Sequence, residues 1–263
     1  MADDQTAPLD SLMRARSSEP IRALYVHVPF CRNICGYCDF YKIPLRGDLV
    51  AATVEALTAE LDRAAACHQL ALRTVFFGGG TPTELPPELL GRLALACAAL
   101  RDRGPGNSID SSPRSLPPSA STSLRPFAPA RLRASAPLCL DEWEFTVEAN
   151  PATITDENAG LLRAAGVNRV SMGAQSFAPA ELRFLDRTHR PEQVAESVRL
   201  CRRHGFEVVN LDLIFGVPGQ TVDSWRASLR SAVELGVDHV SCYALTYEEG
   251  TTLHRRLQTG RVL

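Results

Sequence analysis

Apolar residues show two kinds of spacing along this chain, and segments of the two kinds alternate. Short runs rich in β-branched and aromatic residues are typical of β-strands. Longer segments, in which apolar residues recur every three or four positions, predict amphipathic helices. The predicted strands lie near residues 21–28, 73–77, 143–149, 167–172, 207–213 and 237–243. Because strands and helices alternate, the pattern predicts βαβ units and a parallel sheet.

Four segments carry the helical rhythm most clearly. They are residues 49–66, residues 89–100, residues 191–203 and the segment after Thr221. The side chains expected to face the core are Val50, Val54, Leu57 and Leu61, then Val194, Val198 and Cys201, then Trp225, Leu229 and Val233. Asp48 is the expected N-cap of the first helix, and Pro191 opens the third at a first-turn position, where proline is favoured.

Glycine marks three places where a predicted helix gives way to a strand. Gly166, Gly205 and Gly236 each stand between the last helical residues and the next apolar run. A glycine just past a helix end supplies the left-handed residue of a C-cap. We therefore expect helix ends at these three glycines.

Composition divides the chain into a core and less structured parts. Residues 1–20 are polar and lack periodicity, which predicts a flexible leader. Residues 102–140 are dominated by Ser, Pro and Arg, a composition that cannot bury enough apolar surface to offset chain entropy. We expect a disordered insertion there, with an artefact of the gene sequence as the alternative. The core domain would then span 21–245, and 246–263 would be the truncated start of a C-terminal region.

Charge and length narrow the class of protein. The 263 residues suit one α/β barrel-like domain or two small ones, and 45% hydrophobic residues is ordinary for a soluble protein. A net charge of −2 gives no electrostatic case for binding nucleic acid or an anionic membrane. No apolar run is long enough to span a bilayer, and the acidic N-terminus does not resemble a signal peptide. We therefore expect a cytoplasmic protein.

Three cysteines carry the strongest chemical signal. Cys31, Cys35 and Cys38 form a C-x3-C-x2-C array directly after the first predicted strand. Thiolates select iron–sulfur clusters, zinc or copper(I), and structural zinc sites use four ligands, usually as two pairs. No second pair follows, so the array favours a cluster with one iron left open, over zinc or buried core cysteines. The other five cysteines, expected to be core or surface thiols, are Cys67, Cys97, Cys139, Cys201 and Cys242.

Polar motifs gather where the predicted strands end. They are the cysteine loop, Gly78–Thr81, Glu148 with Asn150, Gln175 and Asp212. In parallel α/β proteins, functional groups collect at the carboxyl ends of the strands. Each motif alone is weak, since a glycine turn or a strand-end Asp is often only structural. Together they predict one site at this edge of the sheet.

The segment 25–40, YVHVPFCRNICGYCDF, resembles the cluster loop of radical S-adenosylmethionine (SAM) proteins. Its flanks narrow the resemblance to the branch of oxygen-independent coproporphyrinogen III dehydrogenases and the related HemW-type haem chaperones. The resemblance implies an open partial (β/α)6 TIM-like barrel, to which six predicted βα units correspond. An eight-stranded barrel with two missed strands, or an open doubly wound sheet, would give a similar pattern. The resemblance also implies a 4Fe–4S cluster on Cys31, Cys35 and Cys38.

The same resemblance implies SAM as cofactor. The matching positions are Tyr25, Tyr37, Gly79, Gly80, Thr81, Glu148, Gln175, Arg187, Asp212 and Thr246. In the family these serve one or two SAM molecules, whose reductive cleavage yields a 5′-deoxyadenosyl radical. An electron donor such as a flavodoxin or ferredoxin is implied as well. His27 shares a strand face with Tyr25, so a role near the cluster and a plain hydrogen bond are both open.

The resemblance leaves three interpretations of the function. Phe40 stands where the dehydrogenases carry a further cysteine and the haem chaperones a phenylalanine, which favours a chaperone that binds haem and passes it to an unknown acceptor. The alternative is a coproporphyrinogen III dehydrogenase, an oxidoreductase acting on a porphyrinogen. Family members continue past the point matching Leu263 into a domain with a histidine motif tied to haem. A non-functional truncated fragment is therefore the third interpretation.

Overall fold

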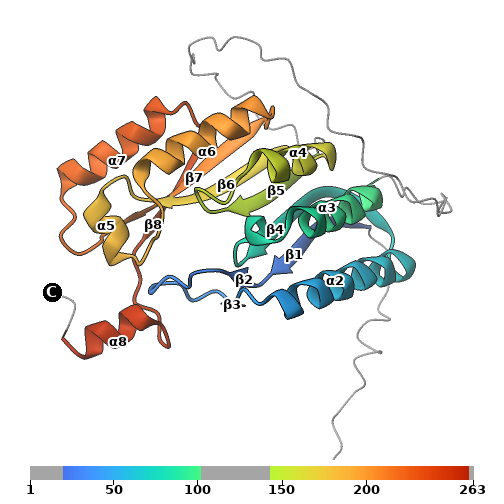
Figure 1. The fold of residues 1–263 in the computed structure, drawn as a ribbon, viewed down its shortest axis with the longest axis horizontal. Coiled ribbons are helices and arrows are strands. Elements are labelled where there is room, and N and C mark those ends of the chain that lie inside the picture. The colour runs from blue at the N-terminus through green and yellow to red at the C-terminus, as the bar shows by residue number, and fades with distance from the viewer. Residues whose placement is uncertain (1–19, 102–142, 261–263) are drawn as a thin grey trace, which may run out of the picture.

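The computed structural model describes residues 20–101 and 143–260 (Figure 1). Six strands form one sheet in the order β1-β4-β5-β6-β7-β8, and every neighbouring pair is parallel. Their bounds are β1 Ile21–Val28, β4 Leu70–Gly79, β5 Glu144–Ala149, β6 Arg169–Gln175, β7 Val208–Phe215 and β8 His239–Ala244. Each strand pairs with the next long strand along the chain, so the sheet grows in one direction. The predicted α/β fold with six strands is confirmed.

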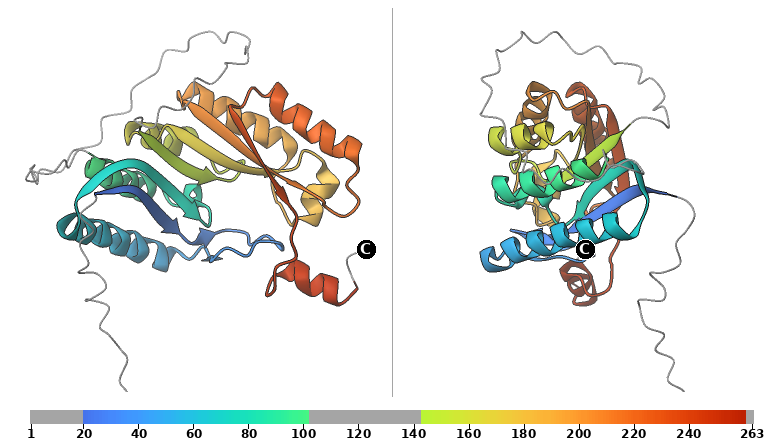
Figure 2. Two further views of the ribbon diagram at one scale, coloured as in Figure 1. Left: turned by 180° about the vertical axis from the view of Figure 1, so that it is seen from behind. Right: turned by 90° about the vertical axis from the view of Figure 1, so that its right-hand side faces the viewer.

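Helices connect the strands and lie against one face of the sheet, except the last helix, which follows the final strand and lies apart from this layer. They are α2 Gly47–Cys67, α3 Pro87–Arg101, α4 Asp156–Ala164, α5 Pro179–Phe184, α6 Pro191–Arg203, α7 Val222–Glu234 and α8 Thr252–Gln258, with a 3-10 turn, η1, at Pro82–Glu84. The view from behind in Figure 2 shows the strands in front and the long helices beyond them, so within residues 20–101 and 143–260 no helical layer covers the other face of the curved sheet. The described part of the chain contains no helix long and apolar enough to cross a bilayer.

The two faces of the sheet differ in chemistry because side chains alternate along each strand. On the helix-covered face, apolar residues such as Val26, Phe145 and Leu211 are 3% exposed or less. The open face carries polar residues at the alternate positions. They are Tyr25, His27, Thr146, Glu148, Arg169, Ser171, Asn210, Asp212 and Ser241. A parallel sheet covered on both faces would be apolar on both, so this polar lining marks the open face as the functional one.

Three expected helix ends and one expected core stripe are confirmed. The glycines at 166, 205 and 236 have φ of 87°, 75° and 66°, the left-handed region that a C-cap requires. Val194, Val198 and Cys201 of α6 are all buried. The expected leader 1–20 and insertion 102–140 lie outside the described residues, apart from Pro20.

Two details of the helices differ from expectation. Asp48 does not cap α2: the cap position is Arg46, and Asp48 lies in the first turn, where its charge favours the helix dipole. In α7 the fully buried positions are Ser228 and Ala232, while Val233 is 57% exposed. Small residues at four-residue spacing let this helix lie close to the sheet, which turns Val233 outward.

Strand bounds differ as well. β4 runs to Gly79, so Gly78 and Gly79 belong to the strand and do not follow it. Asp212 lies in the middle of β7, not at its end. Both shifts place these residues on the open face or its rim, close to the expected site.

Candidate functional site

The cysteine loop crosses the carboxyl end of the sheet between β1 and α2. Cys31 ends the two-residue strand β2 (Phe30–Cys31), which pairs in parallel with β3 (Ile43–Pro44). The Cys31 carbonyl accepts a hydrogen bond from the Leu45 N–H at 2.9 Å, which closes the base of the loop. Cys31 is buried, and Cys35 and Cys38 are partly buried. The loop therefore holds all three thiols at the rim of the open face, the edge of the sheet where the strands have their carboxyl ends. The polar motifs were expected to meet at this rim.

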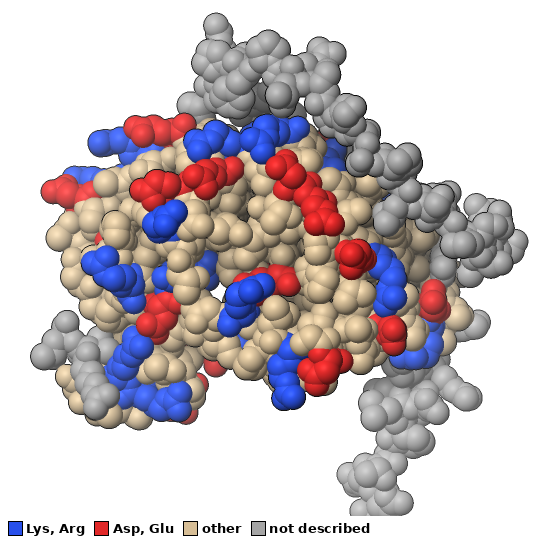
Figure 3. Space-filling view, in the orientation of Figure 1, with Lys and Arg blue, Asp and Glu red and all other residues tan. Residues whose placement is uncertain are grey.

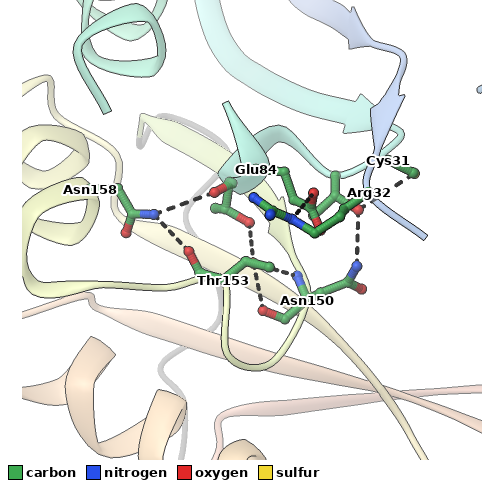
Figure 4. Close-up of polar contacts among 8 residues, drawn as sticks. Cys31, Arg32, Glu84, Asn150, Thr153 and Asn158 are labelled. Atoms are coloured by element: carbon green, nitrogen blue, oxygen red, sulfur yellow. Dashed lines mark hydrogen bonds and ion pairs between the residues drawn. The ribbon is translucent and has the colours of Figure 1, made fainter. Parts of the chain in front are cut away.

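A chain of polar contacts joins two of the three thiols. Thr81 Oγ1 lies 3.6 Å from Cys31 Sγ and accepts a hydrogen bond from Asn150 Nδ2 at 3.0 Å. Asn150 Oδ1 accepts one from Arg187 Nη2 at 2.5 Å, and Arg187 Nη1 donates to Cys35 Sγ at 3.4 Å. Figure 4 shows Cys31 and Asn150 at one end of this chain. Three loops from different βα units thus converge on the cysteines.

Three cysteines on one loop are a ligand set that iron–sulfur clusters use. Among the described residues, no group of three or more His, Cys, Asp or Glu is placed to hold a single metal ion. Ligands of one zinc ion all lie within about 2.3 Å of it, whereas the thiolates of a 4Fe–4S cluster bind different irons. Burial raises the pKa of Cys31 and of Cys38, so both thiols need a metal or donors to become thiolates. The donor set fits an iron–sulfur cluster.

Arg187 is nearly enclosed and has one unused donor. Its Nη2 donates to the Gly173 carbonyl at 2.6 Å as well as to Asn150, but its buried Nε has no hydrogen-bond partner. A buried donor without a partner costs about 1–3 kcal/mol. An anionic group bound beside the cysteines, such as a carboxylate, would satisfy it.

Glu148 stands on the open face of β5 beside the glycines of β4. Its Oε2 accepts a hydrogen bond from the Gly79 N–H at 3.2 Å. Burial raises the pKa of Glu148 to about 7; the Gly79 hydrogen bond opposes this, and the nearby charge of Asp212 adds to it. Two carboxyl groups therefore face the same concave surface, where hydroxyl groups of a ligand could donate to them.

Asp212 is held by neighbours on the open face. Ser171 Oγ donates to its Oδ2 at 3.2 Å, and Asn210 Nδ2 donates to its Oδ1 at 2.8 Å. Both donors are buried. These bonds fix the orientation of the Asp212 carboxyl group, which is partly exposed on the open face.

The glycines at the end of β4 occupy positions that no larger residue could take. A Cβ on Gly78 would lie 2.8 Å from Glu148 Oε2, and one on Gly79, where φ is +107°, would lie 2.4 Å from the His27 ring. A Cβ on Gly80 would lie 2.5 Å from the Phe30 carbonyl oxygen. The glycines thus let β4 and its following loop pass directly beneath the side chains of the rim.

Gln175 has a left-handed backbone, with φ of 65°, at the end of β6. The pairing of β6 with β7 shifts register between Gly173 and Gln175, and such a bulge re-aims a side chain. A Cβ on Gly173 would meet Gln175 Nε2 at 2.8 Å, with Arg187 and Asn150 next nearest. The bulge therefore brings the Gln175 amide to the Arg187 end of the site.

His27 ties the cysteine loop to β1. Its Nδ1 accepts a hydrogen bond from the Tyr25 hydroxyl at 3.1 Å, and its Nε2–H donates to the Tyr41 carbonyl at 3.0 Å. Both ring nitrogens are used in hydrogen bonds, one of which reaches the cysteine loop.

Tyr37 and Thr246 lie in contrasting places. Burial, opposed by Arg187, raises the pKa of Tyr37, which packs against Leu185, Ile214 and Val217. Thr246 is exposed after β8, and no hydrogen bond joins it to the other described site residues. The structure thus brings together all the expected residues except Thr246.

Helix α8 touches the cysteine loop, and no sequence signal predicted this contact. The Leu253 N–H donates to the Gly36 carbonyl at 2.7 Å, and Leu253 is 1% exposed. Arg256 pairs with Asp186 at 3.0 Å, and the Asp186 carbonyl accepts from Asn33. The helix has only seven residues, too few to show an apolar stripe.

A cavity of about 530 Å³ lies behind the loop, outside this constellation. Its wall includes Arg32 and Glu84, which form an ion pair at 3.3 Å, together with Thr153 and Asn158 (Figure 4). None of the residues expected to bind SAM lines it. We therefore place the candidate site at the rim and the open face, and not in this cavity.

Comparison with known proteins points to one family. Residues 25–232 match the family model of the radical SAM superfamily. The haem chaperone HemW of Mycobacterium tuberculosis is 39% identical over 243 residues, with 91% of this chain and 53% of the relative covered. HemW of Bacillus subtilis is 35% identical over 243 residues, covering 92% and 55%. The chain spans about half the length of the curated relatives it matches.

A solved structure agrees in fold. The coproporphyrinogen III oxidase HemN from Escherichia coli superposes with a TM-score of 0.71 at 25% identity, over 94% of this chain and 50% of that protein. The open partial barrel expected from the sequence corresponds to this fold.

Proposed function

This chain belongs to the radical SAM superfamily, and from that premise we propose that Cys31, Cys35 and Cys38 hold a 4Fe–4S cluster, with SAM bound beside it. The observation that carries the proposal is that all three thiols lie on one loop, with Thr81 placed to donate to Cys31 and Arg187 to Cys35. When bound, the cluster and SAM supply reductive one-electron chemistry at the sulfonium carbon–sulfur bond.

The rim offers groups that match the carboxylate, the hydroxyl groups and the ammonium group of SAM. Arg187, with its unpartnered Nε, suits the carboxylate, while Glu148 and Asp212 suit hydroxyl and ammonium groups. The glycines of β4 allow a ligand close to the backbone. The remaining expected contacts are Tyr25, Tyr37, Gln175, Thr81 and, at a distance from the others, Thr246.

For the biological role we propose a haem chaperone, which binds haem and passes it to an acceptor protein. HemW relatives at 39% and 35% identity support this role, as does Phe40, whose side chain is 70% exposed on the cysteine loop. An electron donor of the flavodoxin or ferredoxin class would reduce the cluster. Charges of both signs are interspersed on the helix-covered face in Figure 3.

Coproporphyrinogen III oxidation is the second candidate. HemN superposes on nearly the whole chain, and it is named as a coproporphyrinogen III oxidase. The two candidates share the cluster and SAM and differ in what the open face accepts. Anaerobic incubation with SAM, reductant and coproporphyrinogen separates them: release of carbon dioxide with formation of protoporphyrinogen would overturn the chaperone proposal.

Cluster binding is tested by anaerobic reconstitution. We expect about four irons and four sulfides per chain, and an EPR signal on reduction that SAM perturbs. Cys35→Ala should abolish the cluster, whereas Cys201→Ala, in the core of α6, should leave it. Zinc or no metal in the anaerobically purified protein would refute the proposal, and equal loss in both variants would refute the ligand assignment.

Haem binding needs its own measurement. Titration with haem should give a saturable Soret band in the wild-type chain, and transfer to apomyoglobin would show that bound haem can be released. A chain that holds the cluster but binds no haem would retain the family assignment and lose the chaperone role. A chain with neither would support the fragment interpretation.

A further inference from the structure

Asn150 lies between two loops that reach different cysteines. Its side chain contacts Thr81, which reaches Cys31, and Arg187, which reaches Cys35. Its own backbone is fixed by Thr153, whose Oγ1 accepts from the Asn150 N–H at 3.2 Å and donates to the Asn150 carbonyl at 2.7 Å (Figure 4). Asn150 is thus a rigid bridge at the end of β5.

The chemistry of the partners fixes the direction of every hydrogen bond in the bridge. A guanidinium can only donate, so the Asn150 atom that faces Arg187 must be the carbonyl oxygen. The amide NH2 then faces Thr81 and donates to its hydroxyl oxygen. Because that oxygen accepts from Asn150, the hydroxyl hydrogen is free to point to Cys31 Sγ, 3.6 Å away.

We propose that Asn150 is a positioning residue, which holds the Thr81 hydroxyl and the Arg187 guanidinium as donors to Cys31 and Cys35 and thereby raises the reduction potential of the cluster. Hydrogen bonds to the sulfurs are one of the factors that set the potential of an iron–sulfur cluster. They stabilise the reduced state, which carries the more negative charge. This inference rests on the proposed cluster, and neither the family match nor the sequence assigns Asn150 this role.

An aspartate at this position would act differently. Its two oxygens could still accept from Arg187, but neither could donate to Thr81. The Thr81 hydroxyl would turn to donate to the carboxylate, and Cys31 would lose its donor. The amide nitrogen is therefore the atom on which the proposal depends.

The test is a redox titration of the reconstituted full chain, followed by EPR at each potential. Asn150→Leu removes the donor without adding charge, and Asn150→Asp removes it while keeping the acceptor for Arg187. We expect a more negative midpoint potential in both, at wild-type iron content. In a Thr81→Val background, Asn150→Leu should cause a clearly smaller shift than in the wild type, because the donor it controls is already gone.

Asn168→Leu is the matched control. Asn168 also bridges two segments through its amide, accepting from the Phe145 N–H and donating to the Trp143 carbonyl, but at the opposite end of β5. Its replacement should lower stability and leave the midpoint potential unchanged. An unchanged potential in Asn150→Leu with full iron content would overturn the proposal, as would a full-size shift in the Thr81→Val background.

If Asn150→Leu does not fold, Asn150→Asp is compared in the wild-type and Thr81→Val backgrounds, because the added charge is the same in both and only the loss of the Thr81 donor differs; equal shifts in the two backgrounds would overturn the proposal. Failure of the wild type to take up iron and sulfide would count against the proposed function instead. The two failures are therefore distinguishable.

Discussion

The carboxylate of Glu148 and the backbone N–H of Gly79 form a hydrogen bond of 3.2 Å across neighbouring strands of the open face. Glu148 is otherwise buried beside a second acid, Asp212, and its pKa rises to about 7. The bond to Gly79 opposes this rise but does not cancel it. A carboxyl group at the proposed cofactor site is therefore half-protonated near neutral pH.

This raised pKa predicts a pH dependence of folding. Between the ordinary value of 4.5 and about 7 the folded chain holds the proton more tightly than the unfolded chain. The protonated Glu148 therefore adds to the free energy of unfolding. This contribution, on the order of 3 kcal/mol in total, is fully present below pH 4.5 and is lost as pH rises through 7. In Glu148→Gln the free energy of unfolding should lack this fall. Urea unfolding at several pH values measures it, with the exposed Glu88→Gln as control; parallel curves for wild type and Glu148→Gln would contradict it.

His189 predicts the opposite slope. Burial first, and then the charge of Arg187, lower its pKa to about 4, while its Nε2–H donates to the Ala174 carbonyl at 3.0 Å. As pH falls from 6.5 towards 4 the unfolded chain takes up the proton first, so stability is lost in that window, on the order of 3 kcal/mol. His189→Gln should remove this loss, whereas the exposed His239→Gln should not.

The two slopes overlap between about pH 4.5 and 6.5, so they partly cancel in the wild type. We therefore expect the wild-type free energy of unfolding to vary less with pH there than that of either variant. Equal slopes in all three chains would show that neither buried group titrates as described.

Sequence alone predicted the sheet well, for a physical reason. Helices cover one face of each strand, so residues such as Val147 and Met172 must be apolar at every second position. That constraint acts on neighbouring residues, so it can be recognised in the sequence. The C-x3-C-x2-C array was legible too, because its three residues lie within one loop.

Contacts between distant loops were not predictable. Asn150 and Arg187 are 37 positions apart, and their bond depends on how far two loops extend past the sheet edge. The bulge at Gln175 and the seat of α8 on Gly36 depend likewise on tertiary packing. Val233 was placed wrongly because apolar spacing marks a stripe but not which flank of it is buried.

Gly79 gives a prediction that separates backbone strain from collision. In Gly79→Ala the new Cβ would lie 2.4 Å from the His27 ring, at φ of +107°. The ring cannot move without breaking its bonds to Tyr25 and Tyr41, so we expect a loss of about 3 kcal/mol in unfolding free energy. Gly166→Ala has a similar positive φ but no atom within 4 Å of the new Cβ, and should lose only about 1–2 kcal/mol.

Removing the His27 ring should recover the part of the lost stability that comes from the steric clash with the new Cβ. In a His27→Ala background, Gly79→Ala should cost about as much as Gly166→Ala, because only the backbone strain is left. Denaturant unfolding of the wild type, His27→Ala, Gly79→Ala and the double variant gives the coupling energy between the two positions. A coupling near zero would mean that the loop, and not the His27 ring, gives way.

Leu253 predicts a local effect on the cysteine loop. Its side chain is 1% exposed, and its N–H donates to the Gly36 carbonyl, so it is the main anchor of a seven-residue helix. Leu253→Ala removes a buried side chain, a change that costs about 2–5 kcal/mol in well-packed cores. A seven-residue helix outside the main helical layer opens on its own before the sheet unfolds. We therefore expect faster hydrogen exchange in residues 33–38 and 252–258, with unchanged exchange in β5 and β6. Leu257→Ala, in the same helix but 43% exposed, should leave the loop protected; equal exchange in the two variants would show that α8 does not hold the loop.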